Sequence, residues 1–323
     1  MRKTVSLLLV FFLTFGLLAG CAEAPQETQP TEAETQPQPT EPPEEANVLK
    51  IMILGSSRSV NTFQLLYEAF RDQMPDQELV LGIMYYSGCS MTMHAKFIQN
   101  NESVYDYYRN DSGRWVIQNK VHMDTGLCDD NWDIVLLQAG TGDLANEMNI
   151  NCRTFLQQYV DSRVQHPHKL WWHSTWFNST DPTLYDPTKT KIDPLTVDQY
   201  KQLTDNINAS KAYVFEDPMF SGHINSGTPM MYALKVLDIP EKDLYRDHTH
   251  LSDYGCLLVA YAWYVQFTGK PVEKINLTTI AAETRNPQYR HLGDMEVTEE
   301  MKQVIIDAVA YACENPWVTP GQS

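Results

Sequence analysis

The sequence predicts an α/β domain with a doubly wound, mainly parallel sheet in a three-layer α/β/α arrangement. Residues 48–55, VLKIMILG, form a nearly continuous apolar run that ends in glycine. Such a run is typical of a strand buried on both faces of a parallel sheet. Phe63, Leu66, Tyr67 and Phe70 follow at helical spacing. The same alternation of strand and helix patterns continues along the chain, and it is this alternation that indicates the fold class.

The further elements are predicted from the same two patterns. Apolar runs predict strands at residues 78–88, 132–140 and 168–176. Apolar residues at helical spacing predict helices at residues 150–164, 197–210, 254–269 and 298–315.

Two stretches depart from this rhythm. Residues 101–120 predict a β-hairpin with a turn at Asp111-Ser112-Gly113, and residues 177–195, rich in Asp, Pro and Thr, predict a long loop. Insertions at the carboxyl ends of strands often shape a ligand site. The aromatic residues of these regions either stack on a sugar or pack the hairpin onto the domain; they are Tyr105, Tyr107, Tyr108, Trp115 and Trp176.

The N-terminus predicts an export signal over residues 1–20. A short basic head precedes an apolar run at residues 5–18, which is too short to span a membrane with ordinary flanks. The run ends in Leu-Ala-Gly-Cys, which resembles the bacterial lipobox. The resemblance implies that Cys21 is lipidated and tethers the mature protein outside the cytoplasmic membrane. A plain secretory signal with an incidental cysteine is the alternative.

Residues 21–46 predict a lipidated cysteine followed by a disordered stalk. The segment after Cys21 consists mainly of Pro, Glu, Gln and Thr, and has no aromatic and no basic residue. Such a composition cannot bury enough apolar surface to offset the entropy of ordering the chain. Its prolines favour an extended chain of about 3 Å per residue wherever it adopts polyproline II. The globular domain is therefore expected at residues 47–323.

The acidity of the chain excludes some classes of partner. The formal net charge of the whole chain is −17. Leaving out the two basic residues of the leader and the seven glutamates of the stalk gives about −12 for the domain. An acidic domain repels phosphate backbones and anionic lipid headgroups. We therefore expect no nucleic-acid partner, contact with a membrane only through the lipid anchor, and a neutral substrate such as a sugar.

Cysteine spacing gives no support for a structural zinc site, because no close CxxC pair is present. An odd number of cysteines remains after Cys21, so one or two disulfides are possible and at least one thiol stays unpaired or pairs between chains. These cysteines are Cys89, Cys128, Cys152, Cys256 and Cys313.

Polar groups follow each predicted strand, at the edge of an α/β sheet where ligands bind. The segments are GSSRSVN, SGCSMTMH, QAGTGD and HSTW, in chain order. A further segment, RDHTHLSDYG at residues 246–255, concentrates titratable groups at the start of an apolar helix. A pH switch, a metal site and a catalytic acid–base pair are all compatible with that segment alone.

Taken together, these blocks resemble the SGNH, or GDSL-like, hydrolases. The segments that carry the resemblance are ILGSSRS, SGCSMTMH, WDIVLLQAG and DHTHLSDYG, in that order over residues 48–270. The most similar branch is an uncharacterised bacterial one, a domain of unknown function. The resemblance implies a flavodoxin-like topology and a serine esterase without a cofactor or a metal.

The resemblance also implies a catalytic triad. Ser57 would be the nucleophile at the tip of the first strand, His250 would take its proton, and Asp247 would orient the imidazole. An Asp and a His three residues apart at the entrance of a helix can place the carboxylate beside one ring nitrogen. The other nitrogen then faces the serine.

The oxyanion hole implied by the family is matched only in part. The backbone N–H groups of Ser57 and Gly88 correspond to its first two donors. The family's third donor is an asparagine in a Gly-x-Asn-Asp run, but this chain reads Gly-Thr-Gly-Asp at residues 140–143. We expect the side-chain amide of Gln138 to take its place.

A second departure lies beside the nucleophile, where the branch reads Gly-Asn-Ser-Phe and this chain has Ser56 and Arg58 around Ser57. Arg58 either binds a carboxylate or phosphate of the substrate or points to solvent.

Several alternatives stay open at this point. Ser56 and Ser59 compete with Ser57 as nucleophile, and Cys89 is a further candidate. A metal site could use His248, His250, Asp247 and Asp253, although the helical HExxH spacing is missing. His94 and His173 lie near strand ends and are expected to be structural. Ser252 is expected to cap the following helix.

The sequence thus predicts a lipid-anchored, extracytoplasmic serine esterase. Its substrate is predicted to be an acyl ester, such as an acetyl ester, on a carbohydrate. The rival prediction is a lipoprotein that keeps the fold and binds a glycan or another ligand without hydrolysing it.

Overall fold

The computed structural model describes residues 48–139, 147–215 and 219–321. The predicted signal, Cys21 and the predicted stalk lie outside the described residues, and so does the Gly-Thr-Gly-Asp run at residues 140–143.

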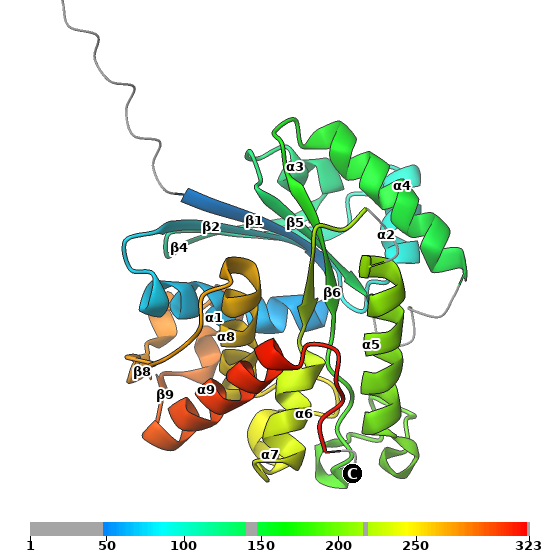
Figure 1. Ribbon diagram of the computed structural model, residues 1–323. Helices are drawn as coiled ribbons and strands as arrows, with labels where there is room; N and C mark the ends of the chain where they lie inside the picture. The colour runs from blue at the N-terminus through cyan, green and yellow to red at the C-terminus, as the bar shows by residue number, and fades with distance from the viewer. Residues whose placement is uncertain (1–47, 140–146, 216–218, 322–323) are drawn as a thin grey trace, which may run out of the picture. The chain divides into compact units, whose positions relative to one another are not determined.

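A seven-stranded sheet organises the domain (Figure 1). Its strands are β1 (Val48–Gly55), β2 (Glu78–Tyr85), β3 (Tyr105–Asp111), β4 (Arg114–Val121), β5 (Ile134–Ala139), β6 (Lys169–Ser174) and β7 (Gly222–Asn225). They lie side by side in the order β4-β3-β2-β1-β5-β6-β7. Two short strands, β8 (Thr279–Ile280) and β9 (Met295–Glu296), form a separate antiparallel pair.

Five strands of the large sheet are parallel. β1 pairs with β2 and with β5, β5 pairs with β6, and β6 pairs with β7, all in parallel. Counted among themselves, these five strands have the order 2-1-3-4-5, which is that of flavodoxin-like sheets. The predicted mixed α/β fold with a mainly parallel sheet is confirmed.

Helices connect the strands and complete the C-terminal part of the domain. They are α1 (Ser57–Gln73), α2 (Met91–Gln99), α3 (Met123–Leu127), α4 (Glu147–Arg163), α5 (Gln199–Phe215), α6 (Gly227–Lys235), α7 (Glu241–Leu244), α8 (Asp253–Thr268) and α9 (Glu299–Glu314).

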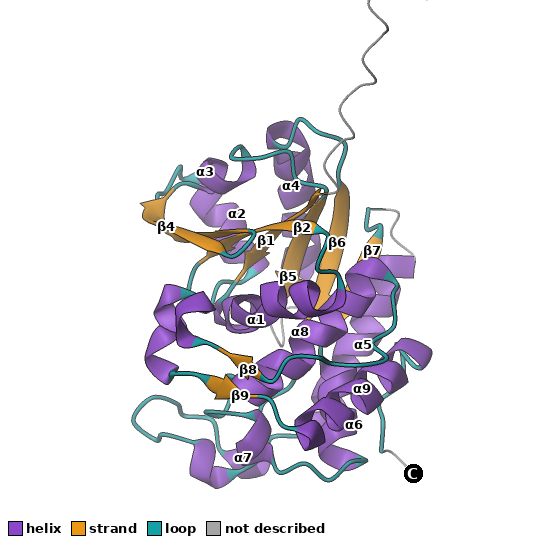
Figure 2. Cartoon of the chain, turned by 90° about the vertical axis from the view of Figure 1, so that its left-hand side faces the viewer, coloured by secondary structure: helices purple, strands orange, loops and turns teal. Residues whose placement is uncertain are grey.

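Alternation along β1 sends its side chains into two different cores, as the pleat of a strand requires. Ile51 and Ile53 are buried in a core that includes residues of α1 and α8. Met52 and Leu54 are buried in a second core, with residues of α2 and α4. Figure 2 shows α1 and α8 on one side of the sheet and α2 and α4 on the other. Burial on both faces explains why β1 is apolar at nearly every position.

The predicted hairpin is confirmed as β3 and β4. Asp111 pairs with Arg114, so the loop consists of Ser112 and Gly113, whose φ angles are 48° and 95°. Positive φ at both loop residues is the requirement of a type I′ turn, which matches the twist of a hairpin. The Trp115 ring packs on Phe63 with centroids 5.5 Å apart.

Four of the five aromatic residues singled out in and near these two stretches are core residues. Tyr105, Tyr107, Tyr108 and Trp176 are all buried. Of the two uses that the sequence allowed for them, packing against the domain is therefore the one that the structure favours.

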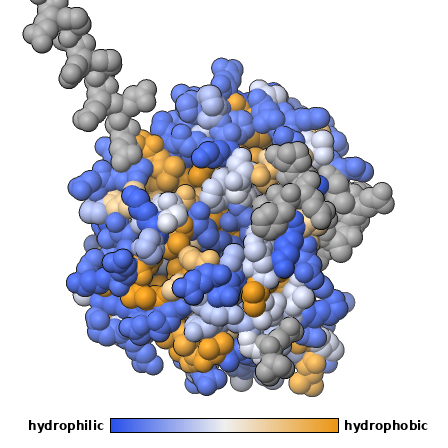
Figure 3. Space-filling model, viewed as in Figure 1, coloured by the Kyte–Doolittle hydropathy of each residue, from blue (hydrophilic) through white to orange (hydrophobic). Residues whose placement is uncertain are grey.

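Helix α8 is a core helix with a defined start and end. Ser252 caps it as predicted, because its Oγ accepts a hydrogen bond from the Gly255 N–H at 3.2 Å. The helix ends at Thr268, and its C-cap is Gly269, which has φ 69°. No described helix combines the length and the apolarity needed to cross a bilayer, and no disulfide joins the described cysteines. Figure 3 shows a mainly hydrophilic face with smaller apolar patches.

Candidate functional site

The candidate site lies where the order of the parallel strands reverses. β1 is flanked by β2 on one side and by β5 on the other. In sheets of this kind, ligands bind beyond the carboxyl ends of the strands at this switch point. Ser57 stands there as the first residue of α1, two residues after the end of β1. Gln138, near the end of β5, contacts the preceding residue, Ser56, across the switch point.

Gln138 ties the turn before α1 to β5. Its Oε1 accepts hydrogen bonds from the backbone N–H of Ser56 at 3.1 Å and of Ser59 at 3.2 Å, and from both of their hydroxyl groups. Its Nε2 donates to Ser56 Oγ at 2.8 Å. Gly55 allows this close approach, because a Cβ there would collide with the Ser59 side chain. The structure thus places Gln138 beneath the turn, and its predicted role as an oxyanion donor stays a prediction.

The three serines of the turn differ in their availability. Ser56 and Ser59 are 5% and 0% exposed, and both are hydrogen-bonded to Gln138. Ser57 is partly exposed, and its hydroxyl has no hydrogen-bond partner among the described residues. As the first helical residue, Ser57 also lies at the positive end of the α1 dipole, which favours developing negative charge. Of the three serine hydroxyl groups, that of Ser57 is therefore the one available to a ligand.

Asp247 and His250 form a hydrogen-bonded pair at the entrance of α8. Asp247 Oδ2 lies 2.9 Å from His250 Nδ1, and Oδ1 accepts from the backbone N–H of Thr249 at 2.9 Å and of His250 at 2.8 Å. Burial alone would raise the pKa of the Asp247 carboxyl. The hydrogen bonds from the His250 ring and the two amides outweigh that effect and hold this pKa well below its ordinary value.

The opposite nitrogen of the imidazole is available. His250 Nε2 has no hydrogen-bond partner in the described part of the chain, and the His250 side chain is 22% exposed. An imidazole held at Nδ1 by a carboxylate, with Nε2 unoccupied, has the arrangement of a general base.

Two hydrogen bonds hold the segment around His250 against the first turn of α1. Arg58, next to Ser57, donates from Nη2 to Thr249 Oγ1 at 2.7 Å. Asn61, one helical turn after Ser57, accepts from the Leu251 N–H at 2.8 Å. The residues before and after His250 are therefore both attached to the helix that Ser57 begins. The Ser57 hydroxyl and the His250 ring share no hydrogen bond among those of the described residues, as is common before substrate binds.

The loop after β6 supports the same segment from the other side. Trp176 Nε1 donates to the carbonyl oxygen of Thr249 at 2.9 Å, and the Ser179 N–H donates to that of His248 at 2.9 Å. The Tyr185 ring lies over His248 with centroids 5.0 Å apart. The predicted long loop at residues 177–195 thus borders the candidate site.

Gly88 lies in an open turn with a left-handed backbone conformation. It is exposed, has φ 63°, and a Cβ built on it would have no neighbour within 4 Å. The turn that contains it starts beside the end of β1, because the Tyr86 N–H donates to the Gly55 carbonyl at 3.4 Å. The N–H groups of Ser57 and Gly88 have no acceptor among the described residues. Both are therefore available to a ligand.

Several other residues considered from the sequence are buried or paired. Cys89, His94 and His173 are buried, with exposed fractions of 3%, 1% and 0%. No three His, Cys, Asp or Glu side chains in the described ranges are arranged to hold a metal ion. Asp253, one of the four residues considered as ligands, pairs with Arg285 at 2.7 Å.

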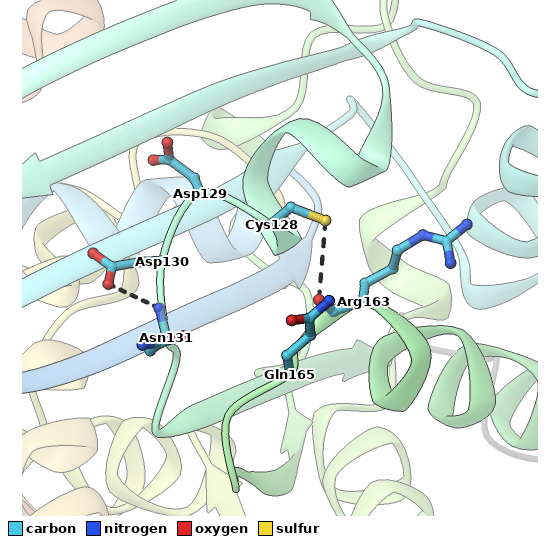
Figure 4. Close-up of a pocket in the computed structure, with 6 residues that line it drawn as sticks. All are labelled: Cys128, Asp129, Asp130, Asn131, Arg163 and Gln165. Carbon is cyan, nitrogen blue, oxygen red and sulfur yellow. Dashed lines mark hydrogen bonds between the residues drawn. The ribbon is translucent and has the colours of Figure 1, made fainter.

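A polar hollow of about 450 Å³ lies elsewhere, beside the start of β5 (Figure 4). It is lined by Cys128, Asp129, Asp130, Asn131, Arg163 and Gln165. These residues precede β5 and β6 in the chain, so they lie at the amino ends of the strands. The hollow is not part of the candidate site.

Sequence reasoning missed two contacts that shape the site. Asn61 was not singled out, although its position four residues after Ser57 puts it on the same face of a helix. Arg58 was expected to reach substrate or solvent, but it is 7% exposed and turned toward Thr249 and the loop after β6. That expectation was wrong, because the buried acceptors around the guanidinium come from segments far away in the chain.

Comparisons with known proteins agree with the fold. The crystal structure of a DUF4886 family protein from Bacteroides uniformis ATCC 8492 is 20% identical and has a TM-score of 0.67. The match covers 85% of this chain and 98% of that one, and it shows a shared fold. A two-domain esterase active on acetylated mannans is 12% identical, with a TM-score of 0.42 over 68% of this chain and 48% of its own.

No curated protein matches the chain in sequence. Residues 50–312 match the model of a family described as a domain of unknown function, DUF4886. This match spans most of the chain, and the shared fold agrees with it. The chain belongs to the DUF4886 family.

Proposed function

We propose that this protein is a serine esterase of SGNH type, built on the three-layer, flavodoxin-like arrangement that its motifs predict. One observation carries the proposal. The Asp247–His250 pair, with its imidazole Nε2 unoccupied, is attached on both sides of His250 to the helix turn that begins with the partly exposed Ser57.

In the first half of the proposed reaction, Ser57 Oγ attacks the ester carbonyl carbon while His250 Nε2 takes the hydroxyl proton. The negative charge that develops on the carbonyl oxygen meets the N–H groups of Ser57 and Gly88 and the positive end of the α1 dipole. When the carbon–oxygen bond to the alcohol breaks, His250 returns the proton to the leaving oxygen. An acyl group then remains on Ser57.

The second half repeats these steps with water. His250 removes a proton from a water molecule, whose oxygen attacks the acyl carbon. The bond from that carbon to Ser57 Oγ then breaks, and His250 returns the proton to Ser57 Oγ, which releases the carboxylic acid and restores the Ser57 hydroxyl. Asp247 stays ionised throughout, because its lowered pKa keeps it a carboxylate that stabilises the imidazolium.

The proposed substrate is an acyl ester, such as an acetyl ester, on a carbohydrate outside the cytoplasmic membrane. The location is proposed from the basic head, apolar run and Leu-Ala-Gly-Cys ending of residues 1–21, with Cys21 as the lipid anchor. The acidity of the chain favours a neutral substrate over an anionic one.

The test is covalent labelling with a fluorophosphonate, together with hydrolysis of p-nitrophenyl acetate. The wild-type protein should react with both, and Ser57→Ala should react with neither. Ser56→Ala and Ser59→Ala are the matched controls, since each removes a neighbouring hydroxyl that Gln138 already holds. Labelling that survives Ser57→Ala would move the nucleophile elsewhere. A folded wild-type protein that neither labels nor hydrolyses would favour the glycan-binding alternative.

A further inference from the structure

We propose that Arg58 is a positioning residue that holds the catalytic loop, residues 247–251, in register with Ser57. The inference rests on the proposed esterase function and deepens it, because it names what attaches the segment that carries the imidazole to the turn that carries the proposed nucleophile.

One guanidinium group contacts three segments at once. Arg58 Nη2 donates to Thr249 Oγ1 and to Asn178 Oδ1, each at 2.7 Å. Nη1 donates to the Trp176 carbonyl and lies 3.4 Å from Thr175 Oγ1. The first turn of α1, the loop after β6 and the catalytic loop therefore meet at a single side chain.

The charge of this side chain is not explained by ion pairing. None of the hydrogen-bond acceptors of Arg58 among the described residues is a carboxylate. Burial lowers the pKa of Arg58 to about 10, against the opposing effect of Tyr245 and Asp247, so the group remains charged at neutral pH. Keeping a buried cation without an ion pair is unfavourable for stability. A flexible apolar side chain would fill the same space at a lower desolvation penalty.

What an apolar side chain lacks is the fixed geometry of the guanidinium. Its planar fork holds several acceptors at set directions, whereas the Lys ammonium is a point charge on a flexible stem. Two atoms of Thr249 are held by residues outside the catalytic loop: its hydroxyl by Arg58 and its carbonyl by Trp176 Nε1 at 2.9 Å. The next residue is His250, so the direction of its ring depends on how Thr249 is held.

The sharpest variant is Thr249→Val, which keeps the shape of the side chain and removes one acceptor of Arg58. Thr175→Val is the matched control, because it removes another hydroxyl contact of Arg58 that lies outside the catalytic loop. We expect Thr249→Val to lower kcat about tenfold or more while KM and the melting temperature change little. Thr175→Val should keep the wild-type kcat.

Substitution of the arginine itself separates geometry from charge. Arg58→Lys should retain less than a tenth of the wild-type kcat. Adding Thr249→Val to this variant should produce little further loss of kcat, because the two residues act through one contact. Full activity in Arg58→Lys would overturn the proposed role of the fork. Equal kcat values in Thr249→Val and Thr175→Val would overturn it as well.

The failure of this inference is distinguishable from failure of the proposed function. If the wild-type protein labels and hydrolyses but the Thr249→Val variant is unimpaired, only the role of Arg58 is wrong. If the folded wild-type protein neither labels nor hydrolyses, the esterase proposal fails and the positioning role fails with it.

Discussion

Gln138 Oε1 lies 3.1 Å from the backbone nitrogen of Ser56 and 3.2 Å from that of Ser59, so one buried side chain of β5 organises the turn that begins α1. Ser56 is the N-cap of α1, yet its side chain makes no capping hydrogen bond. Gln138 instead accepts the hydrogen bonds of the Ser56 and Ser59 donors, while the intervening Ser57 stays partly exposed.

The first prediction concerns this buried amide. Gln138→Met should lower the free energy of unfolding by about 2–4 kcal/mol, because buried N–H and hydroxyl donors lose their acceptor. Denaturant unfolding followed by circular dichroism measures the effect. Gln64→Met is the control: Gln64 is 1% exposed, its Oε1 has no partner in the described part of the chain, and its Nε2 lies 3.9 Å from Cys256 Sγ. Equal losses in both variants would contradict the organising role of Gln138.

The second prediction concerns the carboxylate that holds the imidazole. Asp247→Asn should lower kcat by on the order of 10⁴-fold, because an amide neither fixes the ring tautomer nor stabilises the imidazolium. The lowered pKa of Asp247 also means that the carboxylate stays ionised in mild acid, so protonation of Asp247 should not reduce the activity there. Steady-state hydrolysis across the pH range measures both effects.

Asp243→Asn is the control for that variant, since Asp243 is an exposed carboxylate four residues earlier. It should leave kcat and the pH profile unchanged. An Asp247→Asn protein with wild-type kcat would remove Asp247 from the mechanism.

The sequence predicted the elements of this fold whose patterns are local. β1, β2, β5, β6 and the hairpin were each expected within a few residues of where they lie, because each has an apolar run or a turn of defined chemistry. β7 was missed because GHIN is only four residues long and carries a single large apolar side chain. α2 was missed because it is short and follows a segment of Ser, Gly and Cys that is typical of a loop.

The site was predictable in its residue types but not in its contacts. Ser57, Asp247 and His250 stand in recognisable segments, so their candidacy needed no coordinates. The roles of Arg58 and Gln138 depend on partners 191 and 79 residues away, Thr249 and Ser59. No local pattern carries such information, because it arises only when the strands have paired.

The third prediction concerns the left-handed glycine of the proposed oxyanion hole. Gly88→Ala should lower the free energy of unfolding by about 1 kcal/mol, because an L-residue at φ 63° is strained. It should also lower kcat, since the new methyl group enters open space beside the Gly88 amide. Unfolding and hydrolysis measured on the same preparation separate the two effects.

Gly269→Ala is a matched control, because Gly269 has φ 69° and equally open surroundings but lies at the end of α8. It should lose comparable stability and keep the wild-type kcat. A Gly88→Ala protein that matches the Gly269→Ala protein in both stability and kcat would count against an oxyanion role for Gly88.

The fourth prediction is a dependence of stability on pH through His94. This side chain is 1% exposed, its ring is stacked on Tyr105, and its Nδ1 lies 3.0 Å from the Tyr105 hydroxyl. Burial lowers the pKa of His94 to about 4, while an unfolded chain titrates near the ordinary value of about 6.5. The unfolded state therefore binds the proton more tightly. The contribution of neutral His94 to the free energy of unfolding is complete above pH 6.5 and is lost as the pH falls toward 4. The expected loss is about 3 kcal/mol.

Urea unfolding at a series of pH values between 7.5 and 4 measures this dependence. His94→Gln should reduce the slope of unfolding free energy against pH by up to about 1.4 kcal/mol per pH unit, which is the slope that one bound proton produces. His291→Gln is the control, because His291 is exposed and its Nδ1 lies 3.0 Å from the Gln288 carbonyl oxygen. If both variants keep the wild-type slope of unfolding free energy against pH, the acid sensitivity comes from other groups. His173 and His223 are candidates, because their pKa values are also lowered by burial.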